Sequence, residues 1–206
     1  MVGSLAAAAV LAGGLTAAVA TTSDHGASDA AGAPDSASAD AGFARDMAVH
    51  HQQAVEMSYI VRDRTDDEEV RRLAYDIAQT QANQRGMLLG WLDLWELPKV
   101  PERAPMEWMG MGDAPPGKDG ALMPGMATNT ELSRLEKLRG KEAEVQYLRL
   151  MTRHHRGGVH MAKGCVKRCE VPVERRLARG MVESQTSEIT LLADLLRARG
   201  AKPPAR

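Results

Sequence analysis

The chain carries one spaced signature twice, Met-x-x-His-His-x5-Met, and all four positions of the second copy lie 104 residues after those of the first. The eight residues are Met47, His50, His51, Met57, Met151, His154, His155 and Met161. At 3.6 residues per turn, each copy falls within about 120° of one helix face. Because core residues occupy such a stripe, the signature predicts two amphipathic helices whose buried faces carry paired histidines.

The repeat extends well beyond the signature, since residues 43–92 align with 147–196 without a gap. Capping and breaking residues divide each copy into a helical hairpin. We expect helices over about 41–64, from a Thr65–Glu68 capping box to about Glu96, from a Thr128–Glu131 capping box to about Arg139, over 141–168 after a break at Gly140, and from Pro172 to Arg199 with Gly200 as the cap.

Each hairpin must bury its apolar stripe against another element. Aromatic residues are 3% of the chain and hydrophobic residues 44%, carried by Ala, Leu, Val and twelve Met, which suits helices better than sheets. The duplication therefore predicts an all-α, up-down four-helix bundle made of two duplicated helical hairpins. Its pseudo-two-fold axis would turn the two Met-His-His faces towards each other.

The domain organisation follows from composition. Residues 1–20 form an apolar run that resembles a secretory signal or a short anchor, although the first basic residue is Arg45. A disordered Ala-rich tail is the alternative for this run. Residues 21–41 resemble a flexible linker. Residues 42–200 form the expected bundle, with repeat one at 43–96, a Met-rich connection at 97–127 and repeat two at 128–200.

Buried imidazoles need partners, because removing a polar group from water without one costs roughly 2–7 kcal/mol. Imidazole with thioether is a donor set that favours copper, with Cu(I) preferred and Cu(II) as the other state, whereas zinc and iron do not favour Met. The eight signature residues are thus the candidate metal ligands. The alternative is that the histidines are hydrogen-bonded inside the bundle and the methionines are ordinary core.

Two further clusters carry chemistry. The connection contains five methionines that form a candidate auxiliary metal site: Met106, Met109, Met111, Met123 and Met126. They predict either a mobile arm that captures Cu(I) or a hydrophobic lid on the bundle. Cys165 and Cys169 are the two cysteines, and we expect a local disulfide, with buried thiols or metal ligands as alternatives.

The pattern Phe-x3-Met-x2-His-His-x2-Ala-Val-x-Met, which begins at Phe43, resembles a bacterial family catalogued as domain of unknown function 305, which includes CopM-like envelope proteins. The resemblance covers about residues 43–200. It implies a ferritin-like four-helix bundle, an extracytoplasmic location and, for CopM-like members, copper binding and tolerance. The second copy departs from the first at Arg156-Gly157-Gly158, where the double glycine either loosens the helix or admits another backbone.

The sequence therefore predicts an extracytoplasmic copper-binding protein that sequesters or transfers the ion and is not an enzyme. Expected partners are the metal ion, another copper-handling envelope protein and a second copy of the chain, with no nucleic acid because the net charge is −1. A structural or partner-binding bundle without metal is the alternative. A ferritin-like oxidase is a minor one, because such sites need Glu ligands where Met47 and Met151 stand.

Overall fold

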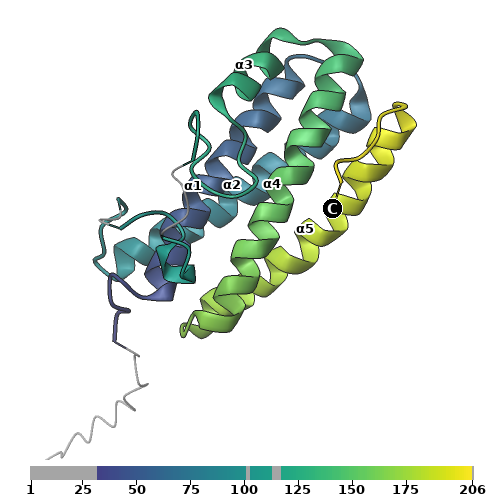
Figure 1. Ribbon diagram of the computed structural model, residues 1–206. Helices are drawn as coiled ribbons and strands as arrows, with labels where there is room; N and C mark the ends of the chain where they lie inside the picture. Colours follow the sequence, from purple (N-terminus) through teal and green to yellow (C-terminus); the bar gives the residue numbers. More distant parts are fainter. Residues whose placement is uncertain (1–31, 101–102, 113–116, 206) are drawn as a thin grey trace, which may run out of the picture. The chain divides into compact units, whose positions relative to one another are not determined.

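The computed structural model describes residues 32–100, 103–112 and 117–205, and every regular element in these ranges is helical. The expected signal-like segment 1–20 and most of the expected linker lie outside the described residues. Two long hairpins make up the fold (Figure 1), and their helices are α1 (Ala39–Arg62) with α2 (Glu68–Leu94), and α4 (Gly140–Arg168) with α5 (Pro172–Ala198). The prediction of an all-α bundle of two duplicated hairpins is confirmed.

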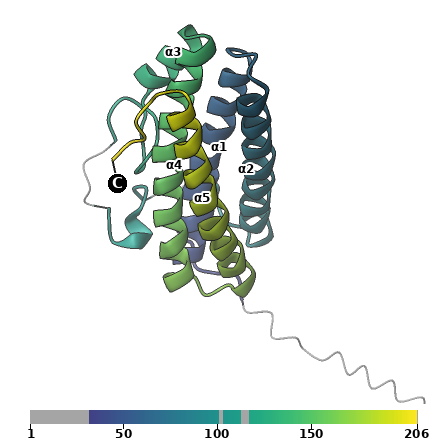
Figure 2. The same ribbon diagram turned by 90° about the vertical axis from the view of Figure 1, so that its right-hand side faces the viewer.

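The hairpins meet along α1 and α4, with α2 packed against α1 and α5 packed against α4 (Figure 2). The amide of Gly140 donates to the Arg64 carbonyl, and the amide of Glu170 donates to Asp40. The start of α4 thus lies beside the end of α1, and its end lies beside the start of α1. Since α1 and α4 are antiparallel, the second hairpin runs down and then up, with the single long crossover of ferritin-like bundles.

That crossover spans the segment between α2 and α4 and contains two short elements. The 3₁₀-helix η1 (Glu107–Met109) docks near the start of α1. Helix α3 (Asn129–Lys137) lies at the other end of the bundle, beside the end of α1 and the start of α4. Thr128 caps α3 through the predicted capping box with Glu131. Gly140 has φ +52°, a conformation that favours glycine, which explains the predicted break before α4.

Two helix starts differ from the sequence prediction. Helix α1 begins at Ala39 because the Ser38 hydroxyl accepts a hydrogen bond from the Ala41 amide, so the bundle takes in the last residues of the expected linker. The predicted Thr65 cap of α2 is wrong, because Asp67 caps this helix by accepting from Val70. The Thr65 hydroxyl is drawn to α4 instead, where it donates to Glu144 at 2.6 Å.

Apolar side chains form two core clusters, one towards each end of the bundle. The first, around Tyr147 and Leu148, joins the two hairpins near α3. The second, around Phe43 and Met181, lies near the start of α1 and takes in the connection. The four signature histidines belong to neither cluster, so the bundle holds polar side chains in its buried interior.

Candidate metal centre

The four signature histidines lie inside the bundle where α1 and α4 pack together. All four are at most 1% exposed. The rings of His50 and His154 face each other, with centroids 3.8 Å apart and planes tilted by 33°. The predicted convergence of the two faces is present in this pair.

Hydrogen bonds fix the proton position on three of the four rings. Nε2 of His154 lies 3.0 Å from the His50 backbone carbonyl, Nε2 of His51 lies 2.9 Å from Gln84 Oε1, and Nε2 of His155 lies 2.5 Å from the Glu188 carboxylate. Each of these oxygens accepts, so each Nε2 carries a proton, and Nδ1 of a neutral ring then keeps a lone pair. Among the described residues, no Nδ1 of the four histidines has a partner in hydrogen-bond geometry, and neither does Nε2 of His50, although the Pro124 carbonyl lies near that ring.

The side chains that hydrogen-bond to His51 and His155 occupy equivalent positions in the two repeats. Gln84 on α2 and Glu188 on α5 each stand 33 positions after the histidine that they contact. They are therefore matched positions of the duplication, with an amide in one repeat and a carboxylate in the other. Such partners orient a ligating imidazole and fix its tautomer. Sequence reasoning missed them, although the gap-free alignment places them opposite each other.

Burial favours the neutral form of three of these imidazoles, those of His50, His51 and His154. Desolvation, and after it the neighbouring His51 ring, lowers the pKa of His50 to about 3, although the Pro124 carbonyl offsets part of this shift. Desolvation lowers the pKa of His51 to about 4 and that of His154 well below its usual value of 6.5. These rings are uncharged at neutral pH, the protonation state in which a histidine binds a metal.

The four signature thioethers are completely buried and lie on both sides of the histidines. Met57 and Met151 belong to the core cluster towards α3, whereas Met47 and Met161 belong to the cluster near the start of α1. Each cluster thus receives one methionine from each repeat. The two-fold arrangement offers sulfur donors at both ends of the histidine layer.

Two buried glutamines add to the polar interior, and nothing in their sequence context marks them as functional. Gln81 and Gln185 are both 3% exposed, and side-chain atoms of each lack a hydrogen-bond partner within the described part of the chain. Gly158 makes room for Gln185, since a Cβ at Gly158 would lie 2.4 Å from Gln185 Oε1. The sequence alignment pairs these glutamines, but it does not show that they point inward.

The methionines of the connection are packed rather than extended into solvent. Met106, Met123 and Met126 are at most 9% exposed, and Met109 and Met111 pack partly buried against the same cluster. Of the two interpretations of this segment, the structure favours the hydrophobic lid over the mobile arm.

The lid is held on both sides. The Gln53 side chain donates to the Ala127 carbonyl and accepts from the Ala127 amide, at 2.9 and 2.7 Å. On α4, a Cβ at Gly157 would lie 1.9 Å from the Pro124 carbonyl oxygen. The double glycine therefore admits another backbone, as one of the two sequence interpretations proposed. The segment 123–127 covers the bundle beside His50.

Ligand spacing limits what the histidines can do alone. In the described ranges, Cys165, Cys169 and Glu174 form the one group of three His, Cys, Asp or Glu ligand atoms within 4.8 Å of one another. The four histidines do not converge to that degree, so an ion bound among them needs the thioether sulfurs or side-chain rotation. Cys165 and Cys169 themselves are joined by a disulfide.

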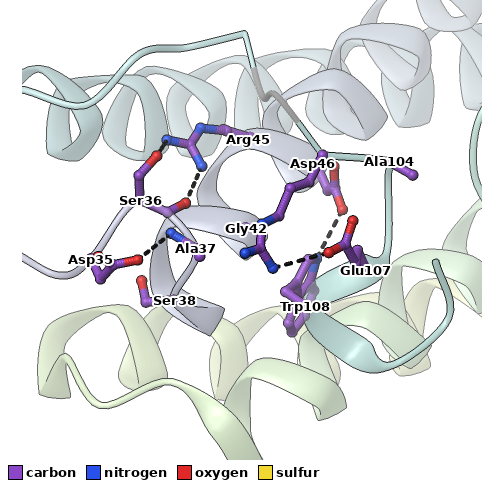
Figure 3. A pocket seen from close by; sticks show the side chains of 11 residues that line it. Asp35, Ser36, Ala37, Ser38, Gly42, Arg45, Asp46, Ala104, Glu107 and Trp108 are labelled. Carbon is purple, nitrogen blue, oxygen red and sulfur yellow. Dashed lines mark hydrogen bonds and ion pairs between the residues drawn. The ribbon is translucent and has the colours of Figure 1, made fainter.

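A separate pocket of about 180 Å³ lies at the start of α1, where the connection docks (Figure 3). The Asp46 carboxylate accepts from the Met106 amide and the Trp108 indole, both at 2.8 Å, and burial raises its pKa. Arg45 donates to Ser36 on the opposite wall. These hydrogen bonds hold the segments that flank α1 against the helix. The polar side chains of this pocket therefore have structural roles.

No helix among the described residues is both long enough and apolar enough to cross a membrane.

The fold and its interior define a class, the duplicated-hairpin helical bundle with histidines and thioethers facing across its two-fold axis. The chain belongs to the DUF305 family, because the family model described as domain of unknown function (DUF305) matches residues 40–196.

Solved structures agree with the family assignment. A DUF305 protein from Streptomyces coelicolor that is thought to be secreted is 73% identical, with a TM-score of 0.78 over 84% of this chain and 100% of its own. A DUF305 fragment from Deinococcus radiodurans is 31% identical, with a TM-score of 0.64 over 78% of this chain and 96% of its own. CopM in its Cu(II)-bound form is 22% identical, with a TM-score of 0.62 over 77% of this chain and 96% of its own, a likeness of fold alone. The comparison with curated proteins yields no match.

Proposed function

We propose that this protein binds copper outside the cytoplasm, with Cu(I) as the preferred state, through the paired histidines and thioethers of α1 and α4. One observation carries the proposal: within the described ranges, four buried imidazoles present an Nδ1 without a hydrogen-bond partner, in two matched copies. A buried polar atom without a partner costs free energy. Copper coordination would satisfy these nitrogens.

The donor types support copper over harder ions. Met47, Met57, Met151 and Met161 would supply thioether sulfur, and the four histidines would supply imidazole nitrogen, a combination that suits Cu(I) and Ag(I). His50 and His154 are the first candidates for nitrogen ligands because their rings lie together. His51 and His155 are oriented by Gln84 and Glu188 and would join them or position them.

Three findings outside this interior agree with the proposal. Structures of CopM have been solved with Cu(I), Cu(II) and silver bound. The disulfide between Cys165 and Cys169 fits an oxidising compartment, as does the likeness to a Streptomyces coelicolor protein thought to be secreted. We assign the protein a non-enzymatic role, to sequester copper or transfer it to another envelope protein.

The test is an anaerobic Cu(I) titration of the full chain against a competing chelator. Replacing both His50 and His154 with Gln should weaken binding by roughly a hundredfold or more, since removing even one outer-shell partner costs 10–100-fold. The matched control is His160→Gln, because His160 is exposed on the opposite face of α4 and its loss should leave the affinity unchanged.

A second pair of variants tests the sulfur ligands. Met47→Leu with Met151→Leu preserves apolar volume but removes one thioether from each core cluster, so Cu(I) affinity should fall while each swap changes stability by less than about 1.5 kcal/mol. Met87→Leu is the control because Met87 is 39% exposed. Equal Cu(I) affinity in all of these proteins would refute the proposal.

A further inference from the structure

A second group of metal-binding side chains lies at the turn between α4 and α5, away from the histidines. Cys165 is in the last turn of α4, Cys169 caps that helix, and Glu174 is in the first turn of α5. One ligand atom from each residue lies within 4.8 Å of the other two. Three donors thus converge at the turn between α4 and α5, which lies at one end of the bundle (Figure 1).

Glu174 is buried beside a second carboxyl group rather than beside a cation. Its exposed fraction is 0%, and burial together with the neighbouring Asp40 carboxylate raises its pKa. Asp40 accepts from the amides of Glu170 and Val171 at 2.8–3.1 Å, whereas neither Glu174 oxygen has a partner in hydrogen-bond geometry among the described residues. Glu174 is therefore held as a neutral acid next to an anion, an arrangement in which a metal ion could replace its proton.

The sulfur atoms can become ligands only after reduction, since thiolates bind metals and a disulfide does not. Cys165 is 0% and Cys169 is 2% exposed, but Cys169 stands between the exposed residues Arg168 and Glu170. Terminal turns of helices open locally more readily than helix interiors. A small reductant therefore has a route to the Cys169 sulfur through the end of α4.

We propose that reduction of the Cys165–Cys169 disulfide creates a second metal site, a zinc site formed by the two thiolates and the Glu174 carboxylate. A dithiol reductant supplies two electrons and two protons to the sulfur–sulfur bond and closes to its own cyclic disulfide. Zn²⁺ then replaces both thiol protons, and any proton on Glu174, which leave to solvent as two Zn–S bonds and one Zn–O bond form.

The donor set favours zinc over the copper of the histidine site. Zinc accepts Cys sulfur together with carboxylate oxygen in tetrahedral sites, and three protein ligands leave a fourth position for water. Cu(I) would be satisfied by the two thiolates and would leave the buried Glu174 oxygen unexplained. The site is therefore independent of the proposed copper function and is sensitive to the redox state of its surroundings.

The test compares the full chain before and after anaerobic treatment with a dithiol, which is then removed by gel filtration. Equilibrium dialysis should show one more zinc ion per chain in the reduced protein. Cobalt(II) in place of zinc should give thiolate-to-cobalt charge-transfer absorption in the reduced protein alone. The bridged loop is very short, so its reduction should leave the helical circular dichroism intact.

Two variants distinguish the contribution of Glu174 to metal binding from that of the two cysteines. Glu174→Gln should keep the charge-transfer absorption but weaken binding of the extra ion roughly tenfold or more. Replacing both cysteines with serine should abolish the redox-dependent difference without loss of helical signal. No extra ion in the reduced chain, loss of helix on reduction, or unchanged affinity in Glu174→Gln would overturn the proposal. None of these results depends on whether the histidines bind copper.

Discussion

Replacing His50 and His51 with Gln should make the stability of the metal-free protein less sensitive to acid. Burial lowers the pKa of His50 to about 3 and that of His51 to about 4, from the usual 6.5. Protons therefore bind these rings in the unfolded chain before they bind them in the folded protein. Stability contributed by neutral rings is present above pH 6.5 and is lost as the pH falls towards the folded-state values.

The magnitude follows from those shifts. Between pH 6.5 and pH 5, each ring loses about 1.4 kcal/mol per pH unit, so each contributes about 2 kcal/mol and the pair about 4 kcal/mol. In a domain of this size, that difference corresponds to roughly 8–16 °C in Tm. The pKa of His154 is also lowered, so its titration adds to the acid sensitivity of both the parent and the variant.

The assay is urea unfolding of the parent and the double variant at pH 7.5 and pH 5, with a chelator present. A comparison between variants is needed because Glu174 titrates in the opposite direction and would mask the loss in the parent alone. The double variant should lose about 4 kcal/mol less on acidification than the parent, and His160→Gln should match the parent. Equal losses in the parent and the double variant would mean that the two rings are accessible to water, which would refute the burial on which the metal centre rests.

Four other variants, of which Gly180→Ala is a control, test the packing of the bundle. Gly157→Ala should destabilise the protein by about 1–3 kcal/mol in thermal unfolding, because its Cβ would lie 1.9 Å from the Pro124 carbonyl oxygen. Gly180→Ala is the control: this position has open space around it, so the substitution should stabilise the helix by up to about 1 kcal/mol. Burial, and then the negative charge of a neighbouring carboxylate, raises the pKa of Glu174 to about 9, so its stabilising contribution is present below pH 4.5 and is lost as the pH rises. Glu174→Gln should therefore raise the free energy of unfolding by up to about 5 kcal/mol at pH 8 and by about 1 kcal/mol at pH 5, and a gain that does not depend on pH would contradict this. Gln53→Ala should release the lid, seen as faster hydrogen exchange of its backbone amides, because both side-chain hydrogen bonds that hold it are lost.

The bundle could be predicted from the sequence because its signals are local and repeated. Thr128 and Glu131 stand at the spacing of a capping box, Pro172 suits a first turn, and the signature stripe fixes the buried faces. Such features depend on a few neighbouring residues. The duplication then predicted that the two hairpins pack against each other.

The remaining features depend on contacts between distant residues. Thr65 has the sequence of a helix cap, but its hydroxyl is used by Glu144, which is 79 positions away. The sequence shows two aligned polar residues at Gln84 and Glu188 but cannot show that each contacts a histidine. The lid was ambiguous for the same reason, since its packing depends on space left at Gly157 on another helix.

Anomalous diffraction at the copper edge from crystals grown with Cu(I) is the most direct test of the central claim. The account predicts a copper peak between α1 and α4, within bonding distance of Nδ1 of His50 or His154 and of at least one signature methionine sulfur. A peak confined to the exposed His160 or to the methionines of the connection, or no peak at all, would contradict it.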